Sequence, residues 1–518
     1  MGYLSFSEKM MNGPYQIKNF RNSINYLMQS SELISALVKL AQREGHQLYL
    51  VGGFIRDTLL GRNSKDVDFV SRRASDLAKS LARETGTRLA FIDRKFGTIR
   101  LIPPAGLHEL SDFYQIDLSP LRGSSIAMDL AQRDFTVNAL AVDLSASQPD
   151  GSFDLLDPLG GLSHLRARRL QLCSPHSLED DPLRILRAYR LAATHDFTLK
   201  GHTQDRIREA RHGLKRIAME RIRDELVLIL STTNSVSILR VLDDDKILQL
   251  LLPECEALRN CSENDYYHQD VWQHSLSALE ALESFLVSPQ ALLGRYADEA
   301  VPILAQSIAG ERTRKIMLKL GVLLHDIGKP SCGAVDENGV TLFYGHEVAG
   351  AEMAGSLCAR FCLSNKETDF VTQLVRQHMR LVHLFSLKRT SRKALSRLFK
   401  LGPELFWPLL FLFGSDYRAT TGPRSQKAEM TPLRHQIDRW LDFYHKQLKP
   451  KEGDPPLVRG HELMNRLNLS PGPTVGKLLH TLEELQWEGR ISTRQGALDH
   501  AAELLNKWTR RKQKTEDN

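Results

Sequence analysis

Two aspartates stand two residues apart in the pattern D-V-D-F-V at residues 66–70. Side chains alternate between the two faces of a β-strand, so Asp66 and Asp68 are predicted to share one face while the apolar residues face a core. Two neighbouring carboxylates repel one another unless a cation lies between them. Mg²⁺ prefers oxygen ligands and is commonly shared with substrate phosphates. The pair therefore predicts a magnesium site that handles phosphate chemistry.

A glycine pair precedes the two aspartates. An apolar run at 48–51 leads into Gly52 and Gly53, and a helical pattern follows them up to Gly61. Glycine lets backbone N–H groups approach a phosphate closely. Either feature alone is usually structural, as a turn or a solvated strand end. Their combined order of strand, glycine turn, helix and strand favours nucleotidyl transfer, in which two metal ions activate a 3′-hydroxyl and stabilise the departing pyrophosphate.

The elements that must position these residues form a small α/β head with a mixed sheet. Short strand patterns follow at 88–93, 98–102 and 114–118. The last of them carries Asp117, a third carboxylate that can act as general base or metal ligand where it faces the pair. Further along, Arg133 offers two donors to a triphosphate, and Asn138 can hydrogen-bond a sugar or the backbone.

A second group of metal-binding residue types lies in the middle of the chain. In chain order they are His274, His325, Asp326, His346, His378 and Asp416. Neutral imidazole and carboxylate suit a divalent metal, and an adjacent histidine and aspartate can bind the same ion. The order H…HD…H…H…D resembles that of HD-type metal-dependent phosphohydrolases. The resemblance implies one ion such as Ni²⁺, Mn²⁺ or Mg²⁺ at His274, His325, Asp326 and Asp416, and a second ion or a phosphate at His346 and His378.

The composition is that of an ordinary soluble globular protein. Among 518 residues, 42% are hydrophobic and 25% charged, and 69 Lys and Arg against 62 Asp and Glu leave a net charge of +7. A basic balance permits a nucleic-acid partner without proving one. The 6 cysteines form no CxxC pair, which favours reduced thiols in a cytoplasmic protein. The sequence has no run of about 18 uncharged apolar residues that would predict a membrane span.

The segment G-G-F-I-R-D-T-L-L-G-R…D-V-D-F-V resembles the signature of the class II tRNA nucleotidyltransferase and bacterial poly(A) polymerase family. The matching positions are Gly52, Gly53, Arg56, Asp57, Leu59, Leu60, Gly61, Arg62, Asp66 and Asp68. The resemblance implies that the two aspartates hold the catalytic Mg²⁺ ions, and that Arg56 lies with the glycines at the triphosphate. It also implies an acidic residue on the strand that carries Asp117.

Two further motifs extend this resemblance into the nucleotide-binding region. The family pattern R-R-D-F-T-x-N-A is matched by Arg133, Asp134, Phe135, Thr136, Asn138 and Ala139. Gln132 replaces the first arginine of that pattern, which removes one phosphate or ribose contact. The segment 180–187 resembles the pattern E-D-x-x-R-x-x-R, with Asp180 in place of the usual glutamate.

A helix is expected from residue 177 onward, with Asp180 and Asp181 in its first turn and Asp180, Arg184 and Arg187 on one face. In relatives, the second acid and the arginine read the Watson–Crick edge of the incoming base. A carboxylate accepts from the exocyclic amino group of cytosine or adenine, and a guanidinium donates to ring acceptors. The resemblance therefore implies that Asp181 and Arg184 select CTP and ATP without a template.

The connection between Asp117 and Asp129 consists only of L-S-P-L-R-G-S-S-I-A-M. Many CCA-adding relatives carry a longer, flexible loop here, which is implicated in the switch from CTP to ATP. A connection this short resembles the relatives that add only the two cytidines. Full CCA addition and CC addition alone both stay open, with a slight preference for CC alone.

The whole chain is predicted to be α+β and mostly helical. We expect a lead-in at 1–47, a mixed-sheet nucleotidyltransferase head at 48–173, a helical neck and body at 174–265 for base selection and RNA binding, an all-α HD domain at 266–425 and a helical tRNA-binding tail at 426–518. The expected partners are tRNA, CTP and ATP, and no membrane. The sequence leaves the oligomeric state open.

Three other functions fit parts of this pattern. A poly(A) polymerase shares the head and neck motifs but typically lacks an HD domain. A signalling uridylyltransferase also joins a nucleotidyl head to an HD domain, but has a different head signature and C-terminal sensing domains. An RNA-binding scaffold with inactive sites would have broken metal positions, and both sets are intact. We therefore expect a template-independent tRNA nucleotidyltransferase whose HD domain hydrolyses phosphoesters in RNA 3′-end repair.

Overall fold

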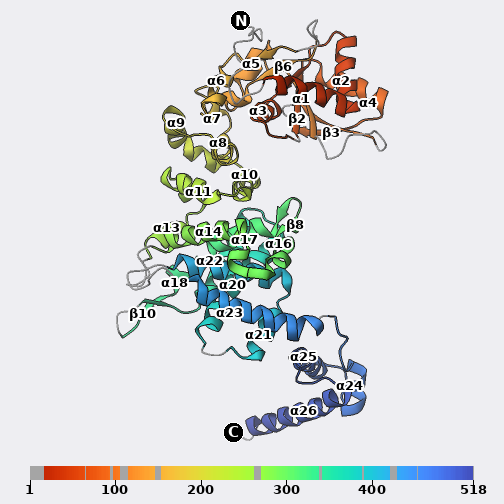
Figure 1. The fold of residues 1–518 in the computed structure, drawn as a ribbon, viewed down its shortest axis with the longest axis vertical. Helices are drawn as coiled ribbons and strands as arrows, with labels where there is room; N and C mark the ends of the chain where they lie inside the picture. Colours follow the sequence, from red (N-terminus) through yellow and green to blue (C-terminus); the bar gives the residue numbers. More distant parts are fainter. Residues whose placement is uncertain are drawn as a thin grey trace. The chain divides into compact units, whose positions relative to one another are not determined.

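The computed structural model describes residues 17–64, 66–93, 97–104, 115–145, 153–261, 270–337, 341–387, 390–420, 429–451 and 453–516. The chain forms two compact units (Figure 1). The first comprises Met1–Ile229 and Val241–Leu250, and the second comprises Leu230–Arg240 and Leu251–Asn518. None of the described helices is long and apolar enough to cross a membrane.

The head is built on one sheet of seven strands in the order β3-β4-β5-β2-β1-β6-β7. The strands are β1 (Tyr49–Val51), β2 (Asp66–Ser71), β3 (Arg88–Asp93), β4 (Thr98–Ile102), β5 (Gln115–Pro120), β6 (Ala141–Asp143) and β7 (Leu155–Leu156). Strand β2 runs parallel to β5 and antiparallel to β1. The predicted mixed sheet is thus confirmed, and the alternation of β2 holds because Val67 and Phe69 are fully buried.

Short helices surround this sheet. They are α1 (Ile17–Ser30), α2 (Glu32–Arg43), α3 (Gly53–Leu59), α4 (Ala74–Thr85), α5 (Ile126–Ala131), the 3-10 turn η2 (Thr136–Asn138) and α6 (Gly161–Arg166). Ser31 caps α2 by accepting a hydrogen bond from the backbone N–H of Ile34. The apolar face of α2 packs against α4, so the end of the expected lead-in lies on the head.

The neck begins with two helices where the sequence predicted one. Helix α7 (Ser177–Asp180) ends at Asp180, and α8 (Arg184–His195) begins three residues after Asp181. Asp181 is extended, with φ −145° and ψ 97°, because the ring of Pro182 disfavours the helical conformation in the residue before it. The prediction that Asp180 shares a helix face with Arg184 was therefore wrong.

The rest of the neck is helical, as predicted. Its elements are α9 (His202–Ala210), η3 (Arg211–Arg216), α10 (Met219–Ser231), α11 (Ser235–Asp244), α12 (Leu248–Leu251) and α13 (Cys255–Arg259). In the first unit, the hydroxyl of Tyr189 donates to the buried carboxylate of Asp245, 2.5 Å away. This contact joins the middle of α8 to the segment that follows α11.

The second unit contains a bundle of apolar helices that carries the histidines. Its helices are α14 (Val271–Val287), α15 (Gln290–Leu293), η4 (Gly294–Tyr296), α16 (Ala297–Ala305), α17 (Arg314–Leu324), α18 (Lys329–Cys332), α19 (His346–Arg360), α20 (Asn365–Ser386), α21 (Arg392–Phe399) and α22 (Pro403–Ala419). Two small hairpins accompany them, β8 (Ser307–Ala309) with β9 (Arg312–Thr313), and β10 (Gly333–Val335) with β11 (Thr341–Phe343).

The C-terminal part of the second unit is helical, as expected. It contains α23 (Met430–Phe443), the π-turn η5 (Tyr444–Leu448), η6 (Lys449–Lys451), α24 (Gly460–Leu467), α25 (Pro473–Trp487) and α26 (Arg494–Glu516). The last three helices share a core around Leu463, Leu478 and Ala497, each of which is fully buried.

Candidate active sites of the head and the HD domain

Three aspartates lie on one face of the head sheet. Asp66 and Asp68 lie on β2, and Asp117 lies on the adjacent parallel strand β5, in register with Asp68. Residues in register on neighbouring strands point to the same face. The structure thus brings together the three acids that the sequence singled out.

The charge balance at these acids favours a cation. Burial, the largest effect, raises the pKa of Asp68, and Asp117 and Asp66 raise it further while Arg133 opposes them. A carboxylate whose ionised form is disfavoured by burial and by other carboxylates gains from a bound divalent ion. Asp66 and Asp68 therefore fit a Mg²⁺ ion in the chemistry of their donor atoms.

Arg100, which the sequence did not single out, binds the third acid. Its Nε lies 2.8 Å from Oδ1 of Asp117, and its Nη2 lies 2.9 Å from Oδ2. Arg100 is opposite Asp117 in the antiparallel pair of β4 and β5. In the sequence, the position of Arg100 at the centre of a strand was the only sign that it could have a role. Its partner Asp117 could be identified only from the pairing of β4 with β5.

The glycine turn approaches both a carboxylate and an arginine. Gly52 has φ +82°, and a Cβ atom there would lie 3.1 Å from Nη1 of Arg133 and 3.3 Å from Oδ2 of Asp68. Any other residue would be strained at this φ and would also crowd these two side chains. Arg133 is further held by Asp129, whose Oδ2 accepts from its Nε at 3.3 Å. Its guanidinium is thus oriented toward the turn.

Arg56 and Asn138 lie in an internal network beneath this turn. Arg56 Nε and Nη2 donate to the two oxygens of Asp57, at 2.8 and 2.9 Å. Its Nη1 donates to Oδ1 of Asn138 at 2.6 Å, and Nδ2 of Asn138 donates to Asp134 at 3.0 Å. These polar atoms are engaged within the protein, whereas the resemblance placed Arg56 at the triphosphate.

The residues expected to read the base lie around the break between α7 and α8. Asp181 forms an ion pair with Arg221 of α10, with 2.9 Å between Oδ2 and Nη2. Arg184 donates to the carbonyl oxygens of Gln132 and Ser177 at 2.9 and 3.1 Å. Asp180 is exposed at the end of α7.

Arg187 turns toward the head. Its Nη1 lies 3.2 Å from Oδ2 of the buried Asp134. Burial alone would raise the pKa of Asp134, but Arg187 and the hydrogen bonds from Asn138 and from the Phe135 backbone hold it below its usual value. Asp134 therefore acts as an ionised anchor inside the protein.

The predicted histidines and aspartates of the second unit converge in its interior. Ligand atoms of His274, His325 and Asp416 form one group within 4.8 Å, and those of Asp326, His346 and His378 form another. Asp326 joins the two groups, because its Oδ2 lies 3.0 Å from Nε2 of His325 while its Oδ1 lies 3.4 Å from Nε2 of His346. The sequence had assigned Asp326 to the first group.

Backbone carbonyls orient three of these imidazoles. Each Nδ1 faces the carbonyl oxygen of the residue three positions earlier, so Nδ1–H donates and Nε2 remains available to a metal. The distances are 2.8 Å for His325, 2.6 Å for His346 and 2.6 Å for His378. Burial lowers the pKa of His378 to about 4, which keeps its imidazole neutral near pH 7.

The buried cluster fits a divalent metal. Nε2 of His325 is buried, and within the described part of the chain it makes no hydrogen bond of acceptable geometry, although Oδ2 of Asp326 lies 3.0 Å away. Neighbouring histidines hold the pKa of Asp326 below its ordinary value although burial alone would raise it. Gly328 allows the segment after Asp326 to pack closely against the start of α19, since a Cβ at Gly328 would lie 2.3 Å from the carbonyl oxygen of His346.

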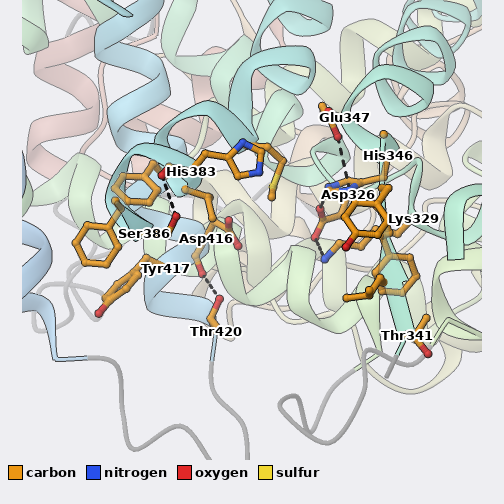
Figure 2. A pocket seen from close by; sticks show the side chains of 18 residues that line it. Asp326, Lys329, Thr341, His346, Glu347, His383, Ser386, Asp416, Tyr417 and Thr420 are labelled. Atoms are coloured by element: carbon orange, nitrogen blue, oxygen red, sulfur yellow. Dashed lines mark hydrogen bonds and ion pairs between the residues drawn. The ribbon is translucent and has the colours of Figure 1, made fainter. Parts of the chain in front are cut away.

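A pocket of about 530 Å³ opens beside this cluster (Figure 2). Asp326, His346 and Asp416 line it, together with Lys329, whose Nζ lies 2.8 Å from Oδ2 of Asp326. Burial lowers the pKa of Lys329 to about 8. The other lining residues include the aromatic side chains Phe343, Tyr344, Phe385, Phe413 and Tyr417. Lys329 stands three positions after Asp326, but no motif in the sequence pointed to a role for it.

Three family models match the chain in sequence. Residues 48–171 match the poly A polymerase head domain, residues 196–258 match the probable RNA and SrmB-binding site of polymerase A, and residues 271–400 match the HD domain. The matched segments contain the carboxylate site of the head and most of the histidine cluster.

Solved structures share the fold. The Thermotoga maritima CCA-adding enzyme complexed with tRNA has a TM-score of 0.58 and 21% identity over 94% of this chain and 97% of that one. A CCA-adding enzyme in complex with CTP has a TM-score of 0.59 and 21% identity, and covers 93% of this chain and 98% of that one.

Curated relatives are similar over nearly their whole length. An A-adding tRNA nucleotidyltransferase of Deinococcus radiodurans is 31% identical, over 86% of this chain and 93% of the relative. A CC-adding tRNA nucleotidyltransferase of Thermus thermophilus is 32% identical, over 86% of this chain and 91% of the relative. The chain therefore belongs to the tRNA nucleotidyltransferase family and is an enzyme of that family, with a poly A polymerase-type head, an RNA-binding segment and an HD domain.

Proposed function

We propose that this enzyme adds cytidines from CTP to the 3′ end of tRNA without a template and stops after two. The observation that carries the proposal is the short connection between β5 and α5. The backbone N–H of Leu121 donates to the carbonyl oxygen of Ser71 at 3.1 Å. That of Arg122 donates to Asp129 at 3.0 Å, and Ser125 caps α5 by accepting from Met128 N–H at 3.3 Å.

This connection is tethered along its length. The resemblance to the family links the switch from CTP to ATP to a long flexible loop at this place. A short connection with three anchored residues lacks the length for that rearrangement. The enzyme therefore keeps one nucleotide preference throughout.

The roles of the head residues follow from their positions. Asp66 and Asp68 hold Mg²⁺, which when bound activates the 3′-hydroxyl and stabilises the pyrophosphate. Arg133, with its Nη1 close to the glycine turn, donates to the triphosphate. Asp181 accepts from the amino group of cytosine, so it exchanges its ion pair with Arg221 for the base.

The test uses three tRNA substrates, which end at the discriminator base, after one cytidine or after two. Each is incubated with CTP, with ATP and with both, and the 3′ ends are sequenced. We expect products that end in CC under all conditions with CTP. A product ending in CCA contradicts CC-only addition, and addition of A alone to CC-ended tRNA indicates an A-adding enzyme. Elongation of generic RNA with ATP alone identifies a poly(A) polymerase.

We further propose that the HD domain hydrolyses phosphoesters at the histidine cluster, since the cluster combines imidazoles and carboxylates with an adjacent pocket. His274, His325, Asp326 and Asp416, with His346 and His378, would hold the divalent metal, which when bound supplies an activated water. Lys329 lines the pocket and donates to a phosphate oxygen. Phosphodiesterase assays on His325→Ala and on the head variant Asp66→Asn/Asp68→Asn test this. Equal activity of His325→Ala and wild type removes the proposal.

A further inference from the structure

Helix α8 is joined to the head near both of its ends. Close to its start, Arg187 Nη1 lies 3.2 Å from Oδ2 of Asp134. At its end, Nε2 of His195 lies 2.7 Å from Oδ1 of Asp57 on α3. Both contacts lie within the first unit. The first joins α8 to Asp134, before the turn η2, and the second joins α8 to the helix that follows the glycine turn.

The two contacts are joined through the head. Asp134 binds Asn138, Asn138 binds Arg56, and Arg56 binds Asp57 with two hydrogen bonds. Asp134, Asn138, Arg56 and His195 each have at most 9% of their surface exposed. A connected and largely buried chain of this kind, in which Asp57 is partly exposed, resists displacement, because breaking one bond leaves polar groups unsatisfied away from water.

Arg56 carries this chain to the glycine turn. A Cβ atom at Gly53 would lie 3.5 Å from its Nη2, so the guanidinium lies directly against the turn. The preceding residue, Gly52, lies close to the side chains of Asp68 and Arg133. The position of the Arg56 side chain therefore limits how the glycine turn can move relative to Asp68 and Arg133.

The backbone of His195 is held independently of its side chain. Arg168 Nη1 donates to the His195 carbonyl oxygen at 2.8 Å. Asp196 follows in the left-handed conformation, with φ 56°, and ends the helix. Burial is the largest effect on the pKa of His195 and lowers it. Its Nε2–H donates to the carboxylate of Asp57, and its Nδ1 lies 2.6 Å from the hydroxyl oxygen of Thr194.

We propose that His195 is a positioning residue for nucleotidyl transfer. Through Asp57 it fixes Arg56 under the glycine turn, and so it couples the placement of α8, which follows the base-reading Asp181, to the placement of the triphosphate. This role rests on the proposed function. The ring of His195 is buried and faces Asp57, so His195 acts through Asp57 and not by contact with the substrate.

The test compares His195→Leu with His195→Gln in the full-length enzyme. Glutamine places an N–H donor near the position of Nε2 and preserves the bond to Asp57, whereas leucine removes it. We expect His195→Leu to raise the KM for CTP about tenfold, the effect of losing one hydrogen bond to a charged group. His195→Gln should stay close to wild type, which a role in packing alone would not produce.

A double-mutant cycle with Asp57→Asn completes the design. If the pair acts as a unit, Asp57→Asn/His195→Leu is no more impaired than the worse single variant. Asp57→Asn also serves where His195→Leu fails to fold, since it keeps the side-chain volume and should raise the KM for CTP in the same direction. An unchanged KM for CTP in the folded variants, or equal impairment of His195→Gln and His195→Leu, overturns the positioning role. Wild-type enzyme that adds no nucleotide to any tRNA overturns the proposed function and with it the inference.

Discussion

Asp68 of β2 and Asp117 of β5 occupy paired positions of two parallel strands. Asp117 is simultaneously bound through both oxygens by Arg100, at 2.8 and 2.9 Å. The third acid of the head is therefore compensated by a protein cation, while Asp68 is left with a raised pKa. This asymmetry distinguishes Asp68, whose ionised form is disfavoured, from Asp117, which is already paired with Arg100.

Arg100→Gln should lower the Mg²⁺ concentration needed for half-maximal transfer. It removes a positive charge near Asp66 and Asp68 and releases the oxygens of Asp117. We expect a shift of about fivefold, the size for one nearby charge at a partly solvated site. Arg100→Lys keeps the charge and is the matched control, expected to need nearly the wild-type concentration. Titration of the transfer rate with MgCl₂ measures both, and an increased requirement in Arg100→Gln contradicts the prediction.

Asp181→Ala should relax the choice of nucleotide more than it slows transfer. The carboxylate accepts a hydrogen bond from the amino group of cytosine, and uracil has no amino group at that position. Loss of the carboxylate should therefore reduce the ratio of kcat/KM for CTP to kcat/KM for UTP by about tenfold. Asp180→Ala is the control, because Asp180 is exposed at the end of α7. Unchanged discrimination in Asp181→Ala would count against base reading by this residue.

Divalent metal should stabilise the unit that contains the histidine cluster. Binding to the folded state alone raises the free energy of unfolding, and saturation with Mn²⁺ or Ni²⁺ should raise its Tm by roughly 5 °C. Thermal unfolding with and without chelator measures the shift, and elemental analysis gives the metal content. His325→Ala should lose most of the shift, and Asp66→Asn/Asp68→Asn should keep it. An equal shift in His325→Ala and wild type places the metal elsewhere.

Glu367→Gln should destabilise the second unit in a pH-dependent way. Burial tends to raise the pKa of Glu367, but Arg312 and Ser364 outweigh it and hold the pKa below its usual value. The stabilisation is therefore present above the unfolded-state pKa of about 4.3 and is lost as the pH falls through the folded-state pKa. At pH 7 we expect a loss of about 1–3 kcal/mol in the free energy of unfolding.

The matched control for this variant is Glu404→Gln. Glu404 forms an ion pair with Arg314 at 3.0 Å, but its side chain is 65% exposed, so its loss should cost less than about 1 kcal/mol. Urea unfolding at pH 7 and pH 4 measures both variants. A Glu367→Gln effect that is as large at pH 4 as at pH 7 is incompatible with the stated cause.

The sequence determined the features that depend on local periodicity. Alternation placed Asp66 and Asp68 on one face of β2 above the buried Val67 and Phe69, and the glycine pair marked the turn before α3. The order of histidines and aspartates identified the residues of the second cluster. The strand alternation and the glycine turn depend on neighbours within a few positions, which a sequence displays directly, whereas the histidine order was recognised by its resemblance to HD-type phosphohydrolases.

Pairing between distant segments was decided only by the tertiary structure. The partnership of Arg100 with Asp117 follows from the order of strands in the sheet, and that of His195 with Asp57 joins residues 138 positions apart. The division of the cluster, with Asp326 shared between both groups, depends on how five segments of the second unit pack. Residue type limits which side chains are able to pair, but long-range packing selects the partner, because side chains meet only after the chain has brought their elements together.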